Sequence, residues 1–290
     1  MRLGTRAYLL RRRLIGIFRR TCTRLRRPSL QLNLEDHVPG THSGLVWTTQ
    51  VVAGRSDELE IVRGNLERLQ PVLAWASLTV DGHSADLARF CKERHSEGFQ
   101  NVLWLSQPGV VGHSHYGKAL GHFHRHDLNY LRGWLCNLEL GEECSAEFFC
   151  HTDGDWELTI RPQSLEQLAR FFHRYPQVVA ISRPLSRLMK DERGMWPDRE
   201  SGGAIWFSDG MLSTNLIIAP IDRFRPLMQK AWAVFHETRG ILLEETLGRL
   251  AGEDGLAVAY PTLEYFTEHL FIEPVEKREP YAPPALAGNP

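Results

Sequence analysis

Near the middle of the chain, residues 148–156 read Phe148-Phe149-Cys150-His151-Thr152-Asp153-Gly154-Asp155-Trp156. A short apolar segment, which predicts a buried strand, leads directly into two carboxylates that flank a glycine. In open α/β sheets, ligands bind beyond the carboxyl ends of the strands. If this strand belongs to such a sheet, we expect Asp153 and Asp155 to lie at its ligand-binding edge.

Predicted strands and helices alternate on both sides of this stretch. Apolar segments predict strands at residues 45–52, 76–80, 101–105, 147–150, 178–182, 213–219 and 256–260. Amphipathic segments predict helices at residues 56–69, 86–97, 127–140, 164–174, 222–236 and 243–250. Residues 190–203 are polar and glycine-rich and predict a loop. The alternation predicts the α/β class, with an open, mostly parallel sheet flanked by helices.

The two ends of the chain differ from the middle in composition. Residues 1–30 contain ten of the 34 basic residues and no acidic residue, so the rest of the chain has 24 basic and 35 acidic residues and a formal net charge of −11. Residues 1–27 alternate arginine clusters with apolar residues, which predicts either an amphipathic helix on an anionic membrane surface or a disordered basic tail. Residues 28–40 read as a linker, and residues 274–290 as a proline-rich extended tail.

Cysteine usage and hydropathy narrow the class of protein. The five cysteines form no C-x-x-C pair, which argues against a disulfide framework and against a zinc ribbon. No apolar run approaches the ~20 residues that a membrane-spanning helix needs. We therefore expect a cytoplasmic protein, peripheral at the inner face of the membrane if the basic arm binds lipid. A basic arm on an acidic body does not indicate a nucleic-acid partner.

The two carboxylates suit one kind of chemistry. Transfer of a sugar from a nucleoside diphosphate leaves a diphosphate with growing negative charge, which a bridging divalent cation stabilises. Carboxylate oxygens are preferred ligands of magnesium and manganese, and one or two of them suffice because magnesium keeps several waters. The sequence therefore predicts a divalent-cation site at Asp153 and Asp155, with a solvated turn as the alternative.

Six segments resemble family 2 type glycosyltransferases with a GT-A fold, in the order in which that family has them. They are Thr49–Leu59, Leu78–Asp86, Asp153–Asp155, Asn215–Ile218, Glu244–Leu250, and Gly255–Pro261 followed by His269. The second segment lacks one aspartate of the family signature, and Glu245 stands where the family usually has aspartate. The resemblance implies a GT-A domain at residues 41–273, with a Rossmann-like donor half at 44–156 and an acceptor half at 157–273.

The resemblance also implies roles for matching positions. Asp153 and Asp155 would hold the metal and diphosphate, with Asp155 as the direct ligand and His269 as a further ligand. Glu244 or Glu245 would be the general base, within reach of the acceptor hydroxyl. The family's register leaves this choice open, and a charged first helical turn is the alternative for the pair. Asp254 remains a rival base.

Donor and acceptor candidates complete the predicted site. Residues that follow the first strands, together with one lysine of the histidine-rich stretch, would bind the donor nucleotide: Val52, Arg55, Asp81, Lys118 and Asp153. On the acceptor side we expect Trp156, Trp206 and Asn215, although core placement is the alternative for the tryptophans. The histidines between His113 and His126 predict a loop over the donor site, a zinc site or solvated side chains.

These features predict an inverting glycosyltransferase with manganese or magnesium as its cation. Its donor would be a UDP-sugar, with GDP and dTDP as alternative nucleotides, and its acceptor a glycan or glycolipid of an envelope polysaccharide or glycolipid pathway. A nucleotidyltransferase would use a similar sheet, metal and carboxylates, but would carry a glycine-rich basic loop after the first strand. A catalytically inactive GT-A-like binding module remains a third interpretation.

Overall fold

The computed structural model describes residues 44–52, 56–81, 89, 102–107, 120–185, 194–235 and 243–277. All of them belong to one compact unit, Val38–Pro290. The predicted basic arm, Arg55, Lys118 and all but one residue of the predicted helix at 86–97 lie outside the described residues. Within the described part, no helix is both long enough and apolar enough to cross a membrane.

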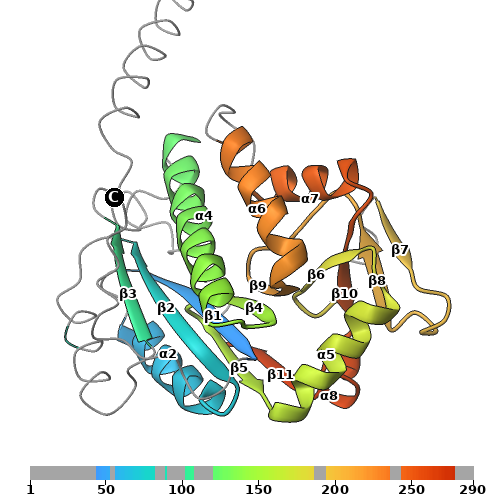
Figure 1. Cartoon of the computed structure of the whole chain (residues 1–290), viewed down its shortest axis with the longest axis horizontal. Helices are drawn as coiled ribbons and strands as arrows, with labels where there is room; N and C mark the ends of the chain where they lie inside the picture. The colour runs from blue at the N-terminus through green and yellow to red at the C-terminus, as the bar shows by residue number, and fades with distance from the viewer. Residues whose placement is uncertain are drawn as a thin grey trace, which may run out of the picture. The chain divides into compact units, whose positions relative to one another are not determined.

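A nine-stranded sheet has the strand order β3-β2-β1-β4-β9-β6-β10-β8-β7 (Figure 1). Its first four strands are parallel to one another: β1 (Leu45–Val52), β2 (Leu73–Asp81), β3 (Val102–Gln107) and β4 (Phe148–Asp153). In the second half, β6 (Val178–Ser182) and β10 (Ala257–Pro261) are parallel partners.

Three further strands make this sheet mixed. Strand β9 (Leu216–Pro220) lies antiparallel between β4 and β6. Strand β8 (Ile205–Ser208) is antiparallel to β10, and β7 (Met195–Pro197) is antiparallel to β8. The predicted α/β class with a mostly parallel sheet is confirmed, although β8 and β9 run against the other strands.

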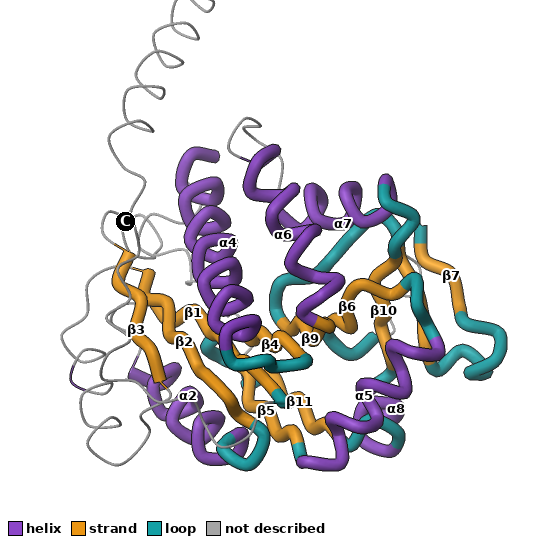
Figure 2. Tube along the Cα trace, viewed as in Figure 1, coloured by secondary structure: helices purple, strands orange, loops and turns teal. Residues whose placement is uncertain are grey.

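Helices cover both faces of the sheet (Figures 1 and 2). One face carries α4 (Leu120–Glu143), α6 (Ile221–Phe235) and α7 (Leu243–Glu253). The other carries α2 (Ser56–Leu69), α5 (Pro162–Arg174) and α8 (Leu263–Glu268). A small antiparallel sheet of β5 (Trp156–Ile160) and β11 (Ile272–Glu276) lies on this second side.

Strand β4 shows why the sequence folds this way. Successive side chains of a strand point to opposite faces. Phe149 stacks on Phe224 of α6, whereas Phe148 stacks on Phe172 of α5. Because both faces are covered, β4 is buried almost throughout, which explains its continuous apolar run. The same alternation puts Asp153 on the α4 side, where Phe149 and His151 also lie.

Several elements differ from the prediction. Strand β4 continues to Asp153, three residues beyond its predicted end, and α4 begins seven residues before the predicted helix. Strands β5, β7, β8 and β11 and helix α8 were not predicted. Strand β7 lies within the predicted loop at 190–203, and the predicted start of the tail at residue 274 lies inside β11.

Candidate functional site

The carboxyl ends of β2, β1 and β4 lie side by side. Val52, the last residue of β1, pairs with Asp81, the last residue of β2. Two positions earlier on β1, Gln50 pairs with Asp153 at the end of β4. The sheet edge therefore brings three predicted donor-side residues together by backbone register, although the side chains of Val52 and Asp81 are outside the described part.

The turn after β4 is tightly packed around its glycine. Gly154 and Asp155 connect β4 to β5, which leaves the main sheet and pairs with β11. A Cβ on Gly154 would lie 3.0 Å from Glu58 Oε2 and 3.1 Å from the Gln50 carbonyl oxygen. Asp155 accepts a backbone hydrogen bond of 2.9 Å from Lys277. The spacing of the two aspartates is thus fixed by close contacts on both sides of the turn.

The buried Asn65 of α2 holds the start of β5. The Asn65 amide nitrogen donates to the Trp156 carbonyl oxygen at 2.7 Å, and the Leu158 N–H donates to Asn65 Oδ1 at 2.8 Å. One buried amide side chain therefore satisfies two backbone groups of β5. This anchors the strand that leaves the main sheet directly after Asp155.

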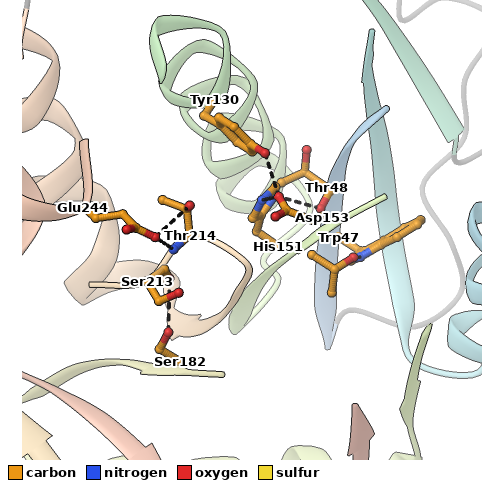
Figure 3. Close-up of polar contacts among 10 residues, drawn as sticks. Trp47, Thr48, Tyr130, His151, Asp153, Ser182, Ser213, Thr214 and Glu244 are labelled. Carbon is orange, nitrogen blue, oxygen red and sulfur yellow. Dashed lines mark hydrogen bonds and ion pairs between the residues drawn. The ribbon is translucent and has the colours of Figure 1, made fainter. Parts of the chain in front are cut away.

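Asp153 is held from the α4 side. The Tyr130 hydroxyl donates a 2.6 Å hydrogen bond to Asp153 Oδ1 (Figure 3). His151 Nε2 lies 3.6 Å from the same oxygen. Nδ1 of His151 lies 3.1 Å from the Thr48 carbonyl oxygen, which only accepts hydrogen bonds, so Nδ1 carries a proton. His151 is 1% exposed and lies between Thr48 of β1 and Asp153, and its Nε2 has no hydrogen-bond partner among the described residues.

The loop between β8 and β9 joins β4 to α7. The Asp153 N–H donates to the Asn215 carbonyl oxygen at 2.9 Å. On the preceding residue, the Thr214 N–H and hydroxyl both donate to Glu244 Oε1, at 2.7 and 3.1 Å. Glu244 lies in the first turn of α7. Two adjacent loop residues therefore connect Asp153 to Glu244, and Figure 3 shows the Thr214–Glu244 bonds in the same view as Asp153.

This loop is fixed along its length. The Tyr260 hydroxyl accepts from the Ser213 N–H at 3.2 Å and donates to the Met211 carbonyl oxygen at 3.0 Å. The Ser182 hydroxyl donates to the Ser213 carbonyl oxygen at 3.1 Å. Burial raises the pKa of the Tyr260 hydroxyl, so it stays protonated and keeps its donor role. The position of Thr214, and hence of Glu244, is set by buried partners.

The structure separates the three candidate bases. Glu244 is half-buried and turned toward the loop, whereas Glu245 is exposed. Asp254 lies ten residues further on, about 15 Å along the helix axis, and accepts a 2.6 Å hydrogen bond from Lys230. Of the three, Glu244 is therefore the one joined to the end of β4.

One predicted metal ligand, His269, is not brought to this edge. Ile272 pairs with Ile160 at the far end of β5, about 13 Å from Trp156, and His269 precedes Ile272. His269 is thus at the opposite end of β5 from Asp155, exposed and packed on Tyr265. Among the described residues, no group of three or more metal-ligating side chains is assembled. A shared cation site would therefore use Asp153 and Asp155 without His269.

The acceptor-side residues have different environments. Trp156 is 5% exposed and part of the hydrophobic core, which is the alternative placement predicted for it from the sequence. Trp206 is half-buried in β8 and donates from its indole nitrogen to the Gly203 carbonyl oxygen at 3.0 Å. Asn215 is half-buried and adjoins the end of β4. Of the three, Asn215 is the residue that the structure connects to Asp153.

Sequence reasoning missed Tyr130 and Thr214. No motif contains them, because each is identified only by the long-range partner that it contacts. Thr214 had a weak signal, its position beside the predicted acceptor residue Asn215. For Tyr130 the only signal was its place on the helix that follows the histidine-rich stretch. Together with Asp153, Asp155 and Glu244, these residues give two carboxylates suited to a cation and a third, separately held carboxylate suited to accept a proton.

No protein-family model matches the chain, and no curated protein has a significant match to its sequence. Among solved structures, the chain is similar to a mannosyltransferase from Pyrobaculum calidifontis in complex with GDP-Man and Mn2+, with 10% identity, 78% of this chain and 57% of that chain covered, and a TM-score of 0.44. It is also similar to a UDP-glucose pyrophosphorylase complexed with UDP-glucose, with 11% identity and a TM-score of 0.40. This match covers 76% of this chain and 90% of the pyrophosphorylase. A third similar structure is TarS from S. aureus, with 10% identity and a TM-score of 0.40. This match covers 78% of this chain and 63% of the TarS chain. The matched part thus spans little more than half of the mannosyltransferase.

Proposed function

We propose that this protein is a metal-assisted glycosyltransferase that moves a sugar from a nucleoside-diphosphate sugar to a hydroxyl of a glycan or glycolipid acceptor. The observation that carries the proposal is the connection between Asp153 and Glu244. Asp153 bonds to the backbone of Asn215, and Glu244 bonds to Thr214, the preceding residue. Leaving-group stabilisation and acceptor deprotonation would then occur on either side of one rigid loop.

The carboxylates of the turn fit a divalent cation. Asp153 Oδ1 is engaged by Tyr130, while Oδ2 has no protein partner among the described residues. Asp155 follows two residues later on a turn fixed by Gly154 and Lys277. Two carboxylates suffice for a cation that also binds a diphosphate and water. When bound, magnesium or manganese offsets the charge that grows on the leaving diphosphate.

Glu244 is the proposed general base. Thr214 directs both of its hydrogen bonds to Oε1 of Glu244, which leaves Oε2 to take the proton of the acceptor hydroxyl. A base held apart from the leaving-group carboxylates favours attack from the opposite side, and so inversion. Val52 and Asp81 adjoin this edge by register and are the proposed nucleotide contacts, with Arg55 and Lys118 as further candidates.

The proposal also covers the donor nucleotide and the cellular surface at which the enzyme acts. A UDP-sugar is the favoured donor, with GDP- and dTDP-sugars as the other two choices. The arginine-rich residues 1–27 would hold the enzyme at an anionic membrane surface on the cytoplasmic side, where an envelope glycolipid or polysaccharide is assembled. Trp206 and Asn215 are the proposed acceptor-side residues.

A thermal-shift panel tests the proposal. UDP, GDP, dTDP, CDP and ADP are each added with and without Mn2+ to the wild-type protein and to Asp155→Ala. We expect one nucleotide to raise the melting temperature only with Mn2+, and Asp155→Ala to lose this shift, because a ligand that binds the folded state stabilises it. The matching nucleoside triphosphates are tested in the same panel, and a shift with a triphosphate but with no diphosphate would favour a nucleotidyltransferase. No shift with any nucleotide would favour a binding module.

A further inference from the structure

The hydroxyl of Tyr130 contacts the carboxylate of Asp153. It donates to Asp153 Oδ1 at 2.6 Å, a short hydrogen bond to a carboxylate. Tyr130 comes from α4, 23 residues before Asp153 in the chain, and is 9% exposed. The Asp153 side chain is 25% exposed, so one part of the carboxylate is buried and another part reaches solvent.

Both recorded side-chain contacts of Asp153 fall on the same oxygen. The Tyr130 hydroxyl and His151 Nε2 approach Oδ1, at 2.6 and 3.6 Å. Within the described part of the chain, Oδ2 has no partner. The carboxylate therefore cannot rotate without losing its bond to Tyr130, and it presents Oδ2 as the oxygen available to a ligand.

The tyrosine ring is itself held in place. It packs edge-on against His151, with ring centroids 5.2 Å apart and an interplanar angle of 86°. It also packs against Trp134, with centroids 5.6 Å apart. Trp134 in turn contacts Phe149 and Phe224 of the core. The hydroxyl is therefore positioned by a buried aromatic cluster, and little side-chain entropy remains to be lost when a ligand binds.

We propose that Tyr130 is a positioning residue that holds Asp153 for single-oxygen coordination of the donor-linked divalent cation. This inference rests on the proposed function. Magnesium and manganese demand near-octahedral geometry, so a carboxylate that presents one oriented oxygen costs less reorganisation than a freely rotating one. Hydrogen-bond partners of metal ligands fix ligand orientation in this way, and losing one typically weakens metal affinity about 10- to 100-fold.

The test compares Tyr130→Phe with Tyr175→Phe. The control removes the same atom from a hydrogen bond of the same kind, since the Tyr175 hydroxyl donates to Asp198 Oδ2 at 2.7 Å. This bond lies away from the sheet edge that carries Asp153. Calorimetry with the nucleoside diphosphate that shifts the wild-type protein gives the Mn2+ concentration for half-saturation. We expect this concentration to rise about 10- to 100-fold in Tyr130→Phe and to stay at the wild-type value in Tyr175→Phe.

Saturating Mn2+ separates positioning from general damage. If Tyr130 acts through the cation ligand Asp153, the nucleotide affinity of Tyr130→Phe returns close to the wild-type affinity when Mn2+ is saturating. An affinity that stays low at saturating Mn2+ would overturn the inference, because the tyrosine would then act on the nucleotide or on the fold. Melting temperatures without ligand show how much each variant is destabilised.

The inference and the proposed function fail in different ways. If the wild-type protein binds a nucleoside diphosphate with Mn2+ and Tyr130→Phe has an unchanged Mn2+ requirement, the role of Tyr130 is refuted and the proposed function stands. If the wild-type protein binds none of the nucleotides with Mn2+, both are refuted.

Discussion

At the scale of single residues, Glu244 and Glu245 are adjacent and chemically identical but differ in their surroundings. Glu244 accepts two hydrogen bonds from Thr214, whereas Glu245 is exposed on the same helix. We expect Glu244→Gln to lower kcat by about 100-fold or more, because general-base catalysis typically contributes 10²–10⁴-fold. Donor affinity should be unchanged, since Glu244 does not contact the leaving group.

Glu245→Gln is the matched control and should keep wild-type kcat. The measurement is sugar transfer or donor hydrolysis, with donor binding followed by calorimetry. Equal losses in the two variants, or a larger loss in Glu245→Gln, would contradict the assignment of Glu244 as the base.

The sequence predicts some site residues and not others for a physical reason. Asp153 stands at the end of a buried strand, and Glu244 stands in the first turn of a helix. Both elements have patterns that neighbouring residues reveal. His269 matched a family position, but β11 pairs with β5 in a register that puts it at the far end of β5 from Asp155. Trp156 directly follows Asp155 in the chain, yet β5 turns it into the core. Both outcomes depend on long-range packing that neighbouring residues do not encode.

At the scale of elements, α7 lies unusually close to the loop that holds Glu244. A Cβ on Gly248 would overlap the backbone of Gly210 and Met211, and one on Gly252 would lie 2.6 Å from the Asp209 carbonyl oxygen. We expect Gly248→Ala to cost about 1–3 kcal/mol of unfolding free energy, as overpacking does. It should also lower kcat, because α7 would move away from Thr214.

Gly64→Ala in α2 is the control for helix propensity. Its added Cβ would lie 3.0 Å from the guanidinium of Arg68, which hydrogen-bonds Leu158 and Asn65 and would have to shift by a few tenths of an ångström. Alanine is favoured over glycine in a helix by about 0.5–1 kcal/mol, so this variant should lose less stability than Gly248→Ala, whose Cβ meets backbone atoms. Urea denaturation of both variants measures the difference. A Gly248→Ala protein as stable as the wild type would show that α7 and the loop are not tightly packed.

The turn between β7 and β8 depends on one carboxylate. Burial raises the pKa of Asp198, but hydrogen bonds from Tyr175 and Ser201 lower it by more, so that its net pKa lies below the ordinary value of 3.8. A carboxyl whose pKa is lower in the folded than in the unfolded state stabilises the protein at pH values above its unfolded-state pKa. This stability is lost as the pH falls through the folded-state pKa. We expect Asp198→Asn to lower the melting temperature at pH 7 and to shrink this difference below about pH 4. A difference that is constant from pH 7 to pH 3 would contradict this origin.

Element prediction succeeded where the pattern was long and local. The predicted bounds of β1, α2 and β6 agree with the structure residue for residue. Strands β5 and β11 were missed because, unlike the equally short β6, neither contains a continuous apolar run, and β11 contains Pro274, which cannot donate a ladder hydrogen bond. They become strands because they pair with each other, although the paired residues are 112 to 120 positions apart in the chain.

At the scale of the whole molecule, the alternation of elements predicts the parallel sheet but not the antiparallel insertion of β9. Strand β9 follows β8 after the loop that holds Glu244, and it enters the sheet between β4 and β6. This insertion is what brings Asn215 to Asp153 and so joins the two halves of the candidate site. A strand's neighbours are set by the packing of the complete chain, so the sequence pattern alone could not place it.

Charge is distributed unevenly along the chain. Residues 1–30 contain ten arginines and no acidic residue, and the rest of the chain has a formal net charge of −11. An arginine near an anionic membrane surface contributes about 1 kcal/mol of attraction, whereas the acidic remainder is repelled by it. We therefore expect the full chain to sediment with vesicles that contain phosphatidylserine, and to be released as salt shortens the screening length.

Replacing the ten arginines with glutamine in the full chain separates membrane binding from the nucleotide site. The variant should stay in the supernatant with the same vesicles, yet keep the Mn2+-dependent nucleotide shift of the wild type, because none of the residues proposed to hold the donor or the cation lies before Val52. Vesicles of neutral lipid are the control and should bind neither protein. If the variant still sediments with anionic vesicles, or if salt does not release the wild type, the attraction is not electrostatic and the apolar residues between the arginine clusters would have to supply it.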